Sequence, residues 1–156
     1  MNENLNGWAI STELFKWIRE NFTEGSIILE MGSGTGTIEL CKHYTMYSVE
    51  HNPRFVGLAA SNYIYAPIKD GWYDMDVLKK MLPERYDLIL VDGPPRRIGR
   101  QGFFDNLDLF RHDVPIVFDD TQRPEEYALA VKTAAFLNMK VTQMFSTDKS
   151  FIILAP

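Results

Sequence analysis

The chain has 156 residues, enough for one domain with one sizeable core, and its 46% hydrophobic and 24% charged residues argue against disorder. The net charge of −5 argues against a nucleic-acid partner, and the single cysteine, Cys41, excludes an internal disulfide. A polar start and the lack of an apolar run of membrane-spanning length predict a cytoplasmic protein without a membrane partner.

The first predicted element is a helix that Ser11 caps and Gly25 ends. Residues 1–25 are therefore expected to form an N-terminal helical segment, and residues 26–156 a core of alternating strands and helices. The predicted strands are residues 26–31, 46–50, 63–66, 86–92 and 115–119. The predicted helices are residues 37–44, 53–60, 74–82, 103–110 and 124–137.

The last two predicted strands, residues 141–145 and 151–154, flank the turn-like sequence STDKS and indicate a hairpin. Five strands separated by helices require right-handed crossovers, and therefore a parallel sheet covered on both faces. The sequence predicts one doubly wound α/β domain over residues 1–156. Its sheet is mostly parallel and seven-stranded, with helices on both faces and a C-terminal antiparallel hairpin strand.

The sequence EMGSGTG, residues 30–36, directly follows the first predicted strand. Its glycines, Gly32, Gly34 and Gly36, allow the backbone to lie close against a ligand where the strand gives way to a helix. Ligands of such sheets bind beyond the carboxyl ends of the strands. Glu50 ends the second strand there, 20 residues after Glu30, and a carboxylate at that place accepts hydrogen bonds from both hydroxyls of a ribose.

A nicotinamide cofactor is the first alternative for this turn. Its G-x-G-x-x-G pattern fits Gly32 and Gly34, but residue 37 is Thr and Gly36 falls one residue early. Glu30 would also lie near a pyrophosphate, whereas a carboxylate suits a ligand with a cationic end better. A nicotinamide-dependent oxidoreductase is therefore the weaker interpretation.

The sequence EMGSGTG resembles motif I of the class I S-adenosylmethionine-dependent methyltransferases, E/D-x-G-x-G-x-G, and SVEHNP and YDLILVDGPP resemble their second and fourth motifs. The resemblance covers almost the whole chain, including the final hairpin. It implies a Rossmann-like fold and S-adenosylmethionine (SAM) as the cofactor, whose amino group Glu30 would favour. The residues that it implies for the cofactor site are Glu30, Gly32, Ser33, Gly34, Thr35, Gly36, Glu50, His51 and Asp92.

The loop VDGPPRRIGRQGFF, after the fourth strand, is the predicted substrate-facing segment. The guanidinium groups of Arg96, Arg97 and Arg100 are suited to hold a carboxylate or phosphate of an anionic acceptor, although a solvated loop is the alternative. GPP resembles part of the D/N-P-P-Y motif of methyltransferases that act on amino groups of nucleic-acid bases. Gly93 intervenes, however, and Arg96 replaces the stacking aromatic residue, so base methylation is the weaker interpretation.

Three carboxylates follow neighbouring strands. Transfer of a methyl group to a hydroxyl requires removal of its proton, and Asp92 is the predicted catalytic base. Together with Asp119 and Asp120 it offers oxygen ligands to Mg²⁺. VFDDT is similar to the acid pair of magnesium-dependent O-methyltransferases of antibiotic sugars, which implies such a site. Pro94 stands where those enzymes carry a further acid or histidine, and helix capping by Asp119 and Asp120 is the alternative.

The sequence therefore predicts an enzyme that transfers a methyl group from SAM to a hydroxyl of a small-molecule or carbohydrate-like acceptor. A SAM-binding module is the alternative, or a subunit whose active site a second copy or another partner completes. The short segment before the first strand favours that alternative, because it offers little to cover a substrate pocket.

Overall fold

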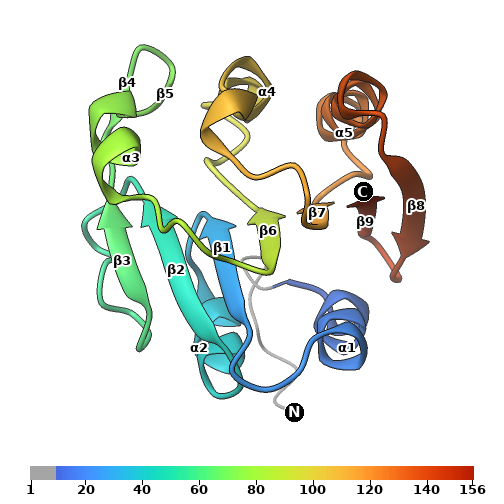
Figure 1. Cartoon of the computed structure of the whole chain (residues 1–156), viewed down its shortest axis with the longest axis horizontal. Helices are drawn as coiled ribbons and strands as arrows, with labels where there is room; N and C mark the ends of the chain where they lie inside the picture. The colour runs from blue at the N-terminus through green and yellow to red at the C-terminus, as the bar shows by residue number, and fades with distance from the viewer. Residues whose placement is uncertain (1–9) are drawn as a thin grey trace.

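The computed structural model describes residues 10–156, and its centre is a seven-stranded sheet (Figure 1). The strand order is β3-β2-β1-β6-β7-β9-β8. The strands are β1 Ile27–Met31, β2 Thr45–Glu50, β3 Asn62–Tyr65, β6 Leu88–Val91, β7 Ile116–Phe118, β8 Lys140–Phe145 and β9 Ser150–Ala155. The first five in the spatial order are parallel, and β9 is antiparallel to both β7 and β8. The predicted mostly parallel sheet with a C-terminal antiparallel hairpin is confirmed.

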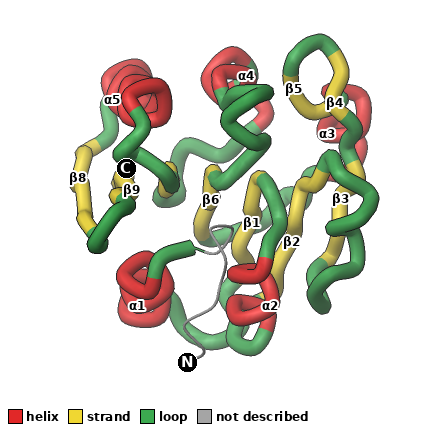
Figure 2. The backbone as a smooth tube through the Cα atoms, turned by 180° about the vertical axis from the view of Figure 1, so that it is seen from behind, coloured by secondary structure: helices red, strands yellow, loops and turns green. Residues whose placement is uncertain are grey.

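Helices cover both faces of the sheet. Figures 1 and 2 show α1 (Thr12–Asn21) and α2 (Thr35–Cys41) on one side, and α3 (Met75–Met81), α4 (Gln101–Asp105) and α5 (Pro124–Leu137) on the other. The side chains of each strand alternate between two hydrophobic cores. In β1, Ile28 joins the core under α1 and α2, whereas Leu29 and Met31 join the core under the other three helices. Within residues 10–156, every helix is too short or too polar to span a bilayer.

Local capping follows the sequence at two helices. The Ser11 side chain accepts a hydrogen bond from the backbone N–H of Leu14 at 3.2 Å, which caps α1 as predicted. The remaining part of the predicted N-terminal segment, residues 1–9, lies outside the described residues. Asp74 caps α3 in the same way, through the N–H of Asp76 at 3.0 Å.

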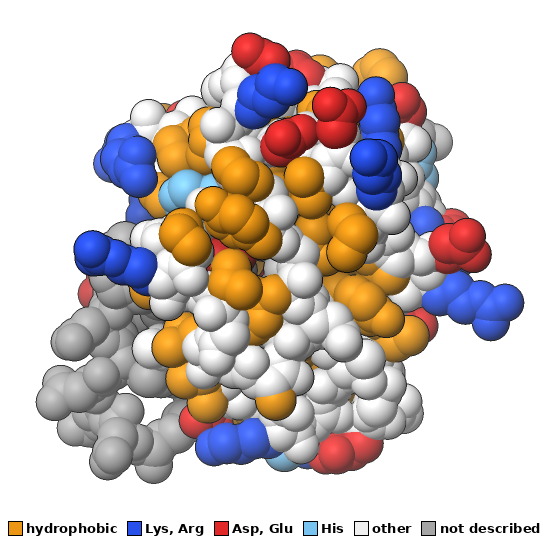
Figure 3. All heavy atoms as spheres, turned by 90° about the vertical axis from the view of Figure 1, so that its left-hand side faces the viewer, with side chains coloured by type: hydrophobic (Ala, Val, Ile, Leu, Met, Phe, Trp, Pro, Cys, Tyr) orange, Lys and Arg blue, Asp and Glu red, His pale blue; other side chains and the backbone are white. Residues whose placement is uncertain are grey.

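The predicted helix over residues 53–60 is wrong, because this segment consists of turns and bends. The Asn52 side chain accepts from the N–H of Arg54, which closes a local turn, and Gly57 then adopts a left-handed φ of +85°. A left-handed residue cannot continue an α-helix. Val56 and Leu58 consequently remain exposed, and Figure 3 shows hydrophobic side chains gathered on the face that carries β3.

A second difference is a small hairpin between β3 and α3, formed by β4 (Ile68–Lys69) and β5 (Trp72–Tyr73). Its turn is Asp70-Gly71, with φ values of +56° and +85°. Asp-Gly is a strong hairpin signal, so the sequence carried the information for this element. The hairpin brings Trp72 and Tyr73 into the core next to Phe103 and Phe110.

The remaining differences concern helix bounds. The helix predicted over 37–44 spans Thr35–Cys41, and the helix predicted over 103–110 is α4, Gln101–Asp105, followed by a 3₁₀ turn at Leu107–Leu109. Both shifts change which residues begin a helix at the carboxyl edge of the sheet. The apolar residues of the second segment, Phe103, Leu107 and Phe110, are buried as expected.

Candidate functional site

A cavity of about 380 Å³ opens at the carboxyl ends of β1, β2, β6 and β7. Of the predicted site residues, those that line it are Gly32, Ser33, Glu50, His51, Asp92, Arg96, Arg97, Arg100 and Asp120. It is also lined by Phe55, Tyr73, Gly93, Pro94, Pro95, Arg123 and Lys149. Parallel strands end at one edge of the sheet, and residues from six separate segments meet here.

The floor of the cavity is backbone packed against backbone. Gly32 has a left-handed φ of +95°, and a Cβ atom at this position would lie 2.9 Å from the carbonyl oxygen of Asp92. A Cβ atom on Gly93 would lie 2.8 Å from the Cα of Gly32. Glycine is therefore required at both positions, because the residues that directly follow β1 and β6, called the exits of these strands below, touch each other.

The other two glycines of the turn have different roles. Gly34 is the N-cap of α2 with an extended φ of −163°, and its N–H donates to Thr37 Oγ1 at 3.1 Å. A Cβ on Gly36 would lie 3.1 Å from the side chain of Ile10, below the α2 backbone. Gly34, Thr35 and Gly36 are not among the residues that line the cavity, so their contact with a cofactor stays a prediction.

Glu30 also lies behind the cavity wall. Its side chain is buried, and one carboxylate oxygen accepts from Thr37 Oγ1 at 2.5 Å and from Ser48 Oγ at 2.6 Å. Burial raises the pKa of this carboxyl from 4.5 to about 7, although the two hydroxyl donors oppose the shift. Glu30 thus ties α2 to β1 and β2. It is not among the residues that line the cavity, so its interaction with the amino group of SAM stays a prediction.

Glu50 ends β2 and does line the cavity, with only 3% of its surface exposed. Its Oε1 accepts from the N–H of Ser33 at 3.1 Å, and its Oε2 from the N–H of Asn52 at 2.6 Å. The Nδ1 of His51 lies 3.2 Å from Oε2. Because a carboxylate can accept about four hydrogen bonds, Glu50 still has capacity for a ligand, at Oε1 above all.

Asp92, Asp119 and Asp120 converge, with one oxygen from each within 4.8 Å of the others. Basic side chains hold these oxygens. Lys149 Nζ lies 3.1 Å from Asp119 Oδ2 and 3.2 Å from Asp120 Oδ1, and Arg100 Nη2 lies 2.9 Å from Asp120 Oδ2. The predicted Mg²⁺ site is not supported, since ammonium and guanidinium groups already balance the carboxylates.

The electrostatics differ between these acids. Burial, together with the neighbouring Asp119, raises the pKa of Asp92 well above its usual range. Burial also acts to raise the pKa of Asp120, but Lys149 and Arg100 outweigh it, and the pKa is lowered. Asp92 is therefore the more basic of these two carboxylates, and its backbone carbonyl lies against Gly32 at the cavity floor.

The three predicted substrate arginines lie in three different environments. Arg100 is 4% exposed, and its guanidinium donates to the carbonyl oxygens of Pro94, Asp119 and Asp92 as well as to Asp120. Arg100 therefore fixes the loop from inside, and its predicted contact with an anionic acceptor stays a prediction. Arg96 pairs with Glu125 on α5, and Arg97 is exposed at the cavity edge.

The sequence places Tyr73 in the loop expected at the carboxyl edge of the sheet, where a substrate-pocket residue and packing at a helix start are both open interpretations, but it does not indicate Arg123 or Lys149. Lys149 lies in the β8–β9 turn, and Arg123 precedes α5 and lies 3.5 Å from Asp120. No local pattern predicts these contacts, because they join segments far apart in sequence. Tyr73 follows the Asp-Gly turn of the β4–β5 hairpin, which holds it at that edge.

Neither a family model nor a curated protein sequence matches the chain. A SAM-dependent methyltransferase from Archaeoglobus fulgidus is similar in structure, with a TM-score of 0.63 at 13% identity over 92% of this chain and 91% of that one. The Mtq2–Trm112 complex of E. cuniculi is similar with a TM-score of 0.55 at 18% identity, over 94% of this chain and 96% of that one. Magnesium protoporphyrin IX methyltransferase from Synechocystis PCC 6803, with bound SAM, is similar with a TM-score of 0.57 at 12% identity. The likeness covers 92% of this chain and 77% of that one.

These likenesses agree with the topology described above. The strand order and the antiparallel β9 describe one architecture, and many solved structures similar to it are SAM-dependent methyltransferases. The chain therefore has the class I, Rossmann-like fold of the SAM-dependent methyltransferases.

Proposed function

We propose that the protein is a SAM-dependent methyltransferase whose acceptor is a small molecule with a hydroxyl group, carbohydrate-like and anionic. The observation that carries the proposal is one cavity that joins the Gly32 turn, the buried carboxylate of Glu50 and the carboxylate of Asp92. This set offers close backbone approach, an acceptor for sugar hydroxyls and a base within a single space.

The residues of the cavity fit the cofactor. Gly32 and Ser33 bring bare backbone to the floor, and Glu50 has unused acceptor capacity for ribose hydroxyls. The volume of about 380 Å³ lies within the roughly 300–1,000 Å³ typical of small-molecule sites. When bound, SAM supplies a methyl group on a sulfonium leaving group. The protein must then align the acceptor and remove its proton.

Asp92 is the residue that we assign to proton removal. Asp92 directly follows β6 and lines the cavity. Its pKa is raised, so its carboxylate is a stronger base than that of an ordinary aspartate. Arg97 and Arg123 lie at the same cavity and carry positive charge toward it. They are suited to a carboxylate or phosphate on the acceptor, and Arg100 supports them by fixing the loop.

The test is ligand-dependent stabilisation. S-adenosylhomocysteine should raise the melting temperature, since a ligand at about 100 times its Kd adds about 2.7 kcal/mol to the unfolding free energy. Glu50→Gln should reduce the affinity by about 1–3 kcal/mol, measured by calorimetry. Glu39→Gln, on the outer part of α2, is the matched control and should bind as the wild type does. Stabilisation by NAD instead, or none by S-adenosylhomocysteine, would overturn the proposal.

A second candidate is a SAM-binding subunit that a partner completes. One structurally similar protein is a methyltransferase in complex with a second subunit. Exposed apolar side chains on α5 and β8, Phe136 at 71% and Phe145 at 70%, are the kind of surface that such a partner covers. Methyl transfer by the isolated chain to any hydroxylated acceptor would exclude this candidate. Cofactor binding without transfer, over a broad acceptor panel, would favour it.

A further inference from the structure

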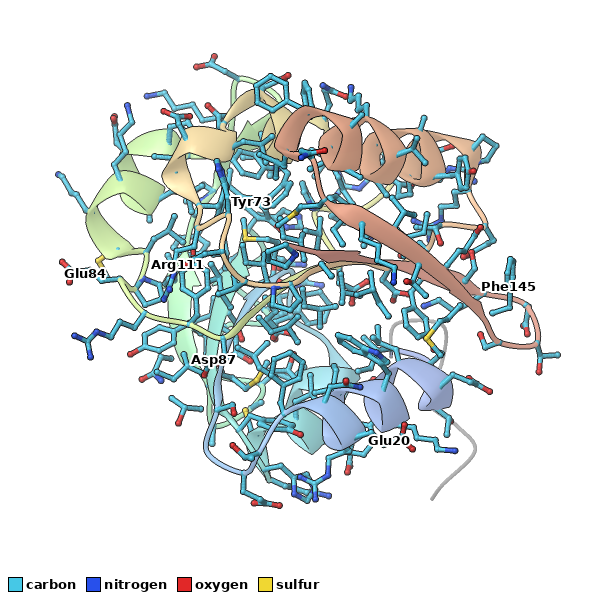
Figure 4. The ribbon with its side chains drawn as sticks, turned by 45° about the vertical axis from the view of Figure 1, so that its right-hand side comes forward. Glu20, Tyr73, Glu84, Asp87, Arg111 and Phe145 are labelled. Carbon is cyan, nitrogen blue, oxygen red and sulfur yellow. The ribbon has the colours of Figure 1, made fainter. Side chains whose placement is uncertain are left out.

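The hydroxyl of Tyr73 is a buried polar group in the wall of the cavity. Tyr73 ends β5 and is 0% exposed, and its ring packs edge-on against Trp72 and lies 6.5 Å from the ring of His51. Figure 4 labels it in the interior of the molecule, between the sheet and the helices. The ring is therefore fixed by its neighbours, and the direction of the hydroxyl is fixed with it.

The hydroxyl lies where the exits of β1 and β6 meet. A Cβ atom on Gly93 would be 2.7 Å from the Tyr73 oxygen and 2.8 Å from the Cα of Gly32. Both glycines and Tyr73 line the cavity, together with Glu50 and Asp92. The oxygen thus lies beside the cavity floor, close to the backbone against which a ligand would lie.

Within residues 10–156, five buried side-chain atoms have no hydrogen-bond partner, and they belong to Thr35, Trp72, Tyr73, Asp119 and Glu126. Tyr73 is the one residue of this set that lines the cavity. An unpaired buried hydroxyl destabilises the folded protein, so a packed Phe would be the more stable choice. A hydroxyl kept at such a place indicates a partner that arrives with a ligand.

The hydroxyl keeps its proton and can therefore donate a hydrogen bond to that ligand. Burial, with the nearby Glu50 carboxylate, raises the pKa of Tyr73 well above its usual range, so the phenol keeps its proton. Glu50 has the opposite character, because an ionised carboxylate only accepts. A ligand hydroxyl can satisfy both at once, since it donates one hydrogen bond and accepts others.

We propose that Tyr73 is a ligand-binding residue that donates a hydrogen bond to a sugar hydroxyl of the bound nucleoside, while Glu50 accepts a hydrogen bond from that hydroxyl or from its neighbour. This inference rests on the proposed function, which places a nucleoside in the cavity. It adds a donor from the β4–β5 hairpin to a site otherwise made from the strand exits.

The experiment compares Tyr73→Phe with the wild type, using S-adenosylhomocysteine as the probe in calorimetry. The variant should bind about tenfold more weakly, which corresponds to about 1.4 kcal/mol. Its melting temperature without ligand should be unchanged or higher, because the substitution removes an unpaired buried hydroxyl and keeps the ring. A merely structural role for the hydroxyl would give the reverse pattern, a lower melting temperature and unchanged affinity.

Tyr44→Phe is the matched control. The Tyr44 hydroxyl is also buried, but it donates to the carbonyl oxygens of Ile18 and Phe22 and lies outside the cavity. This variant should lose stability and keep its affinity for the probe.

A double-mutant cycle with Glu50→Gln then tests whether the two side chains act on the same group. The loss of affinity in Tyr73→Phe should shrink when Glu50 is already changed, because contacts to one hydroxyl are coupled. Equal losses in both backgrounds would overturn the pairing with Glu50. Full affinity in Tyr73→Phe would overturn the inference while leaving the proposed function intact. Failure of the wild type to bind the probe would instead overturn the proposed function.

Discussion

Glu30 and Glu50 lie at the ends of neighbouring strands and are equally buried at 3%, yet their surroundings assign them different roles. Glu50 accepts from backbone N–H groups and faces the cavity, whereas Glu30 accepts from two hydroxyl side chains behind it. The sequence EMGSGTG predicts an acid near the ligand. The hydrogen-bond partners in the folded protein are what distinguish Glu50, which lines the cavity, from Glu30, which holds the turn in place.

We expect Glu30 to make the stability of the protein depend on pH. Its pKa is about 7 in the folded state and near 4.5 when unfolded, so the folded state binds more protons between these values. The unfolding free energy should fall as the pH rises from about 4.5 to 7, and then level off. Glu30→Gln removes this loss and should be more stable than the wild type at pH 8 by roughly 1–3 kcal/mol.

Urea denaturation at pH 5 and pH 8 measures this effect. The advantage of Glu30→Gln should be small at pH 5, where the wild-type carboxyl is mostly protonated. Glu20→Gln, an exposed position on α1 that Figure 4 labels, is the control and should change stability little at either pH. The same stability difference at both pH values would show that Glu30 is ionised throughout.

Among the elements, the β1–α2 turn and the β6 exit pack directly against each other. They can do so because Gly32 and Gly93 have no Cβ atom, which would keep the two segments apart. Gly32 and Gly93 approach through Cα atoms and carbonyl oxygens. The cavity floor is made by this contact, and Tyr73 from the β4–β5 hairpin closes it from the side. Three segments that are separate in sequence therefore set the shape of the site.

Gly32→Ala tests this contact against Gly71→Ala. Both glycines have a left-handed φ, +95° at Gly32 and +85° at Gly71, but nothing lies within 4 Å of a Cβ at Gly71. In the Gly71→Ala variant, backbone strain alone should lower the free energy of unfolding by about 1–2 kcal/mol. Gly32→Ala should lose more and also reduce the affinity for S-adenosylhomocysteine. Equal losses in thermal or denaturant unfolding would mean that the two exits separate without cost.

At the scale of the whole molecule, the C-terminal hairpin brings a cation to the acids at the far end of the sheet. Lys149 contacts Asp119 and Asp120 across about 30 residues of sequence, and these acids follow β7, the strand that pairs with β9. Burial lowers the pKa of Lys149, but Asp119 and Asp120 outweigh this effect, so the side chain stays charged. The antiparallel strand thus has an electrostatic role as well as a packing role.

Replacement of Lys149 by Met should expose the charge repulsion that the lysine now balances. We expect the free energy of unfolding to fall by roughly 1–3 kcal/mol. This is less than for a fully buried ion pair, because the lysine side chain is 25% exposed. Millimolar Mg²⁺ should partly restore the melting temperature of this variant, since its freed carboxylates are hard oxygen ligands. The wild type should respond neither to Mg²⁺ nor to a chelator.

Lys140→Met, in the same hairpin but exposed on β8, is the control and should behave like the wild type. If Mg²⁺ raised the melting temperature of the wild type as well, the three aspartates would be a metal site despite the basic residues around them.

The sequence by itself determined the sheet, the closing hairpin and the edge at which the site lies. Alternating apolar runs, helix caps and glycines depend on neighbours in the chain, and parallel strands necessarily end at a common edge. It also placed Gly32, Glu50 and Asp92 at the cavity. The one predicted helix that was wrong, residues 53–60, failed where Gly57 takes a left-handed φ that a start signal at Asn52 does not reveal.

Only the tertiary structure decided what each charged or polar side chain does at that edge. It buried Arg100 under the loop, engaged Glu30 with the hydroxyls of Thr37 and Ser48, and brought Lys149 into the site from a distant segment. The physical reason is that burial and charge pairing depend on atoms that are close in space and remote in sequence, whereas strand and helix patterns depend on residues close along the chain.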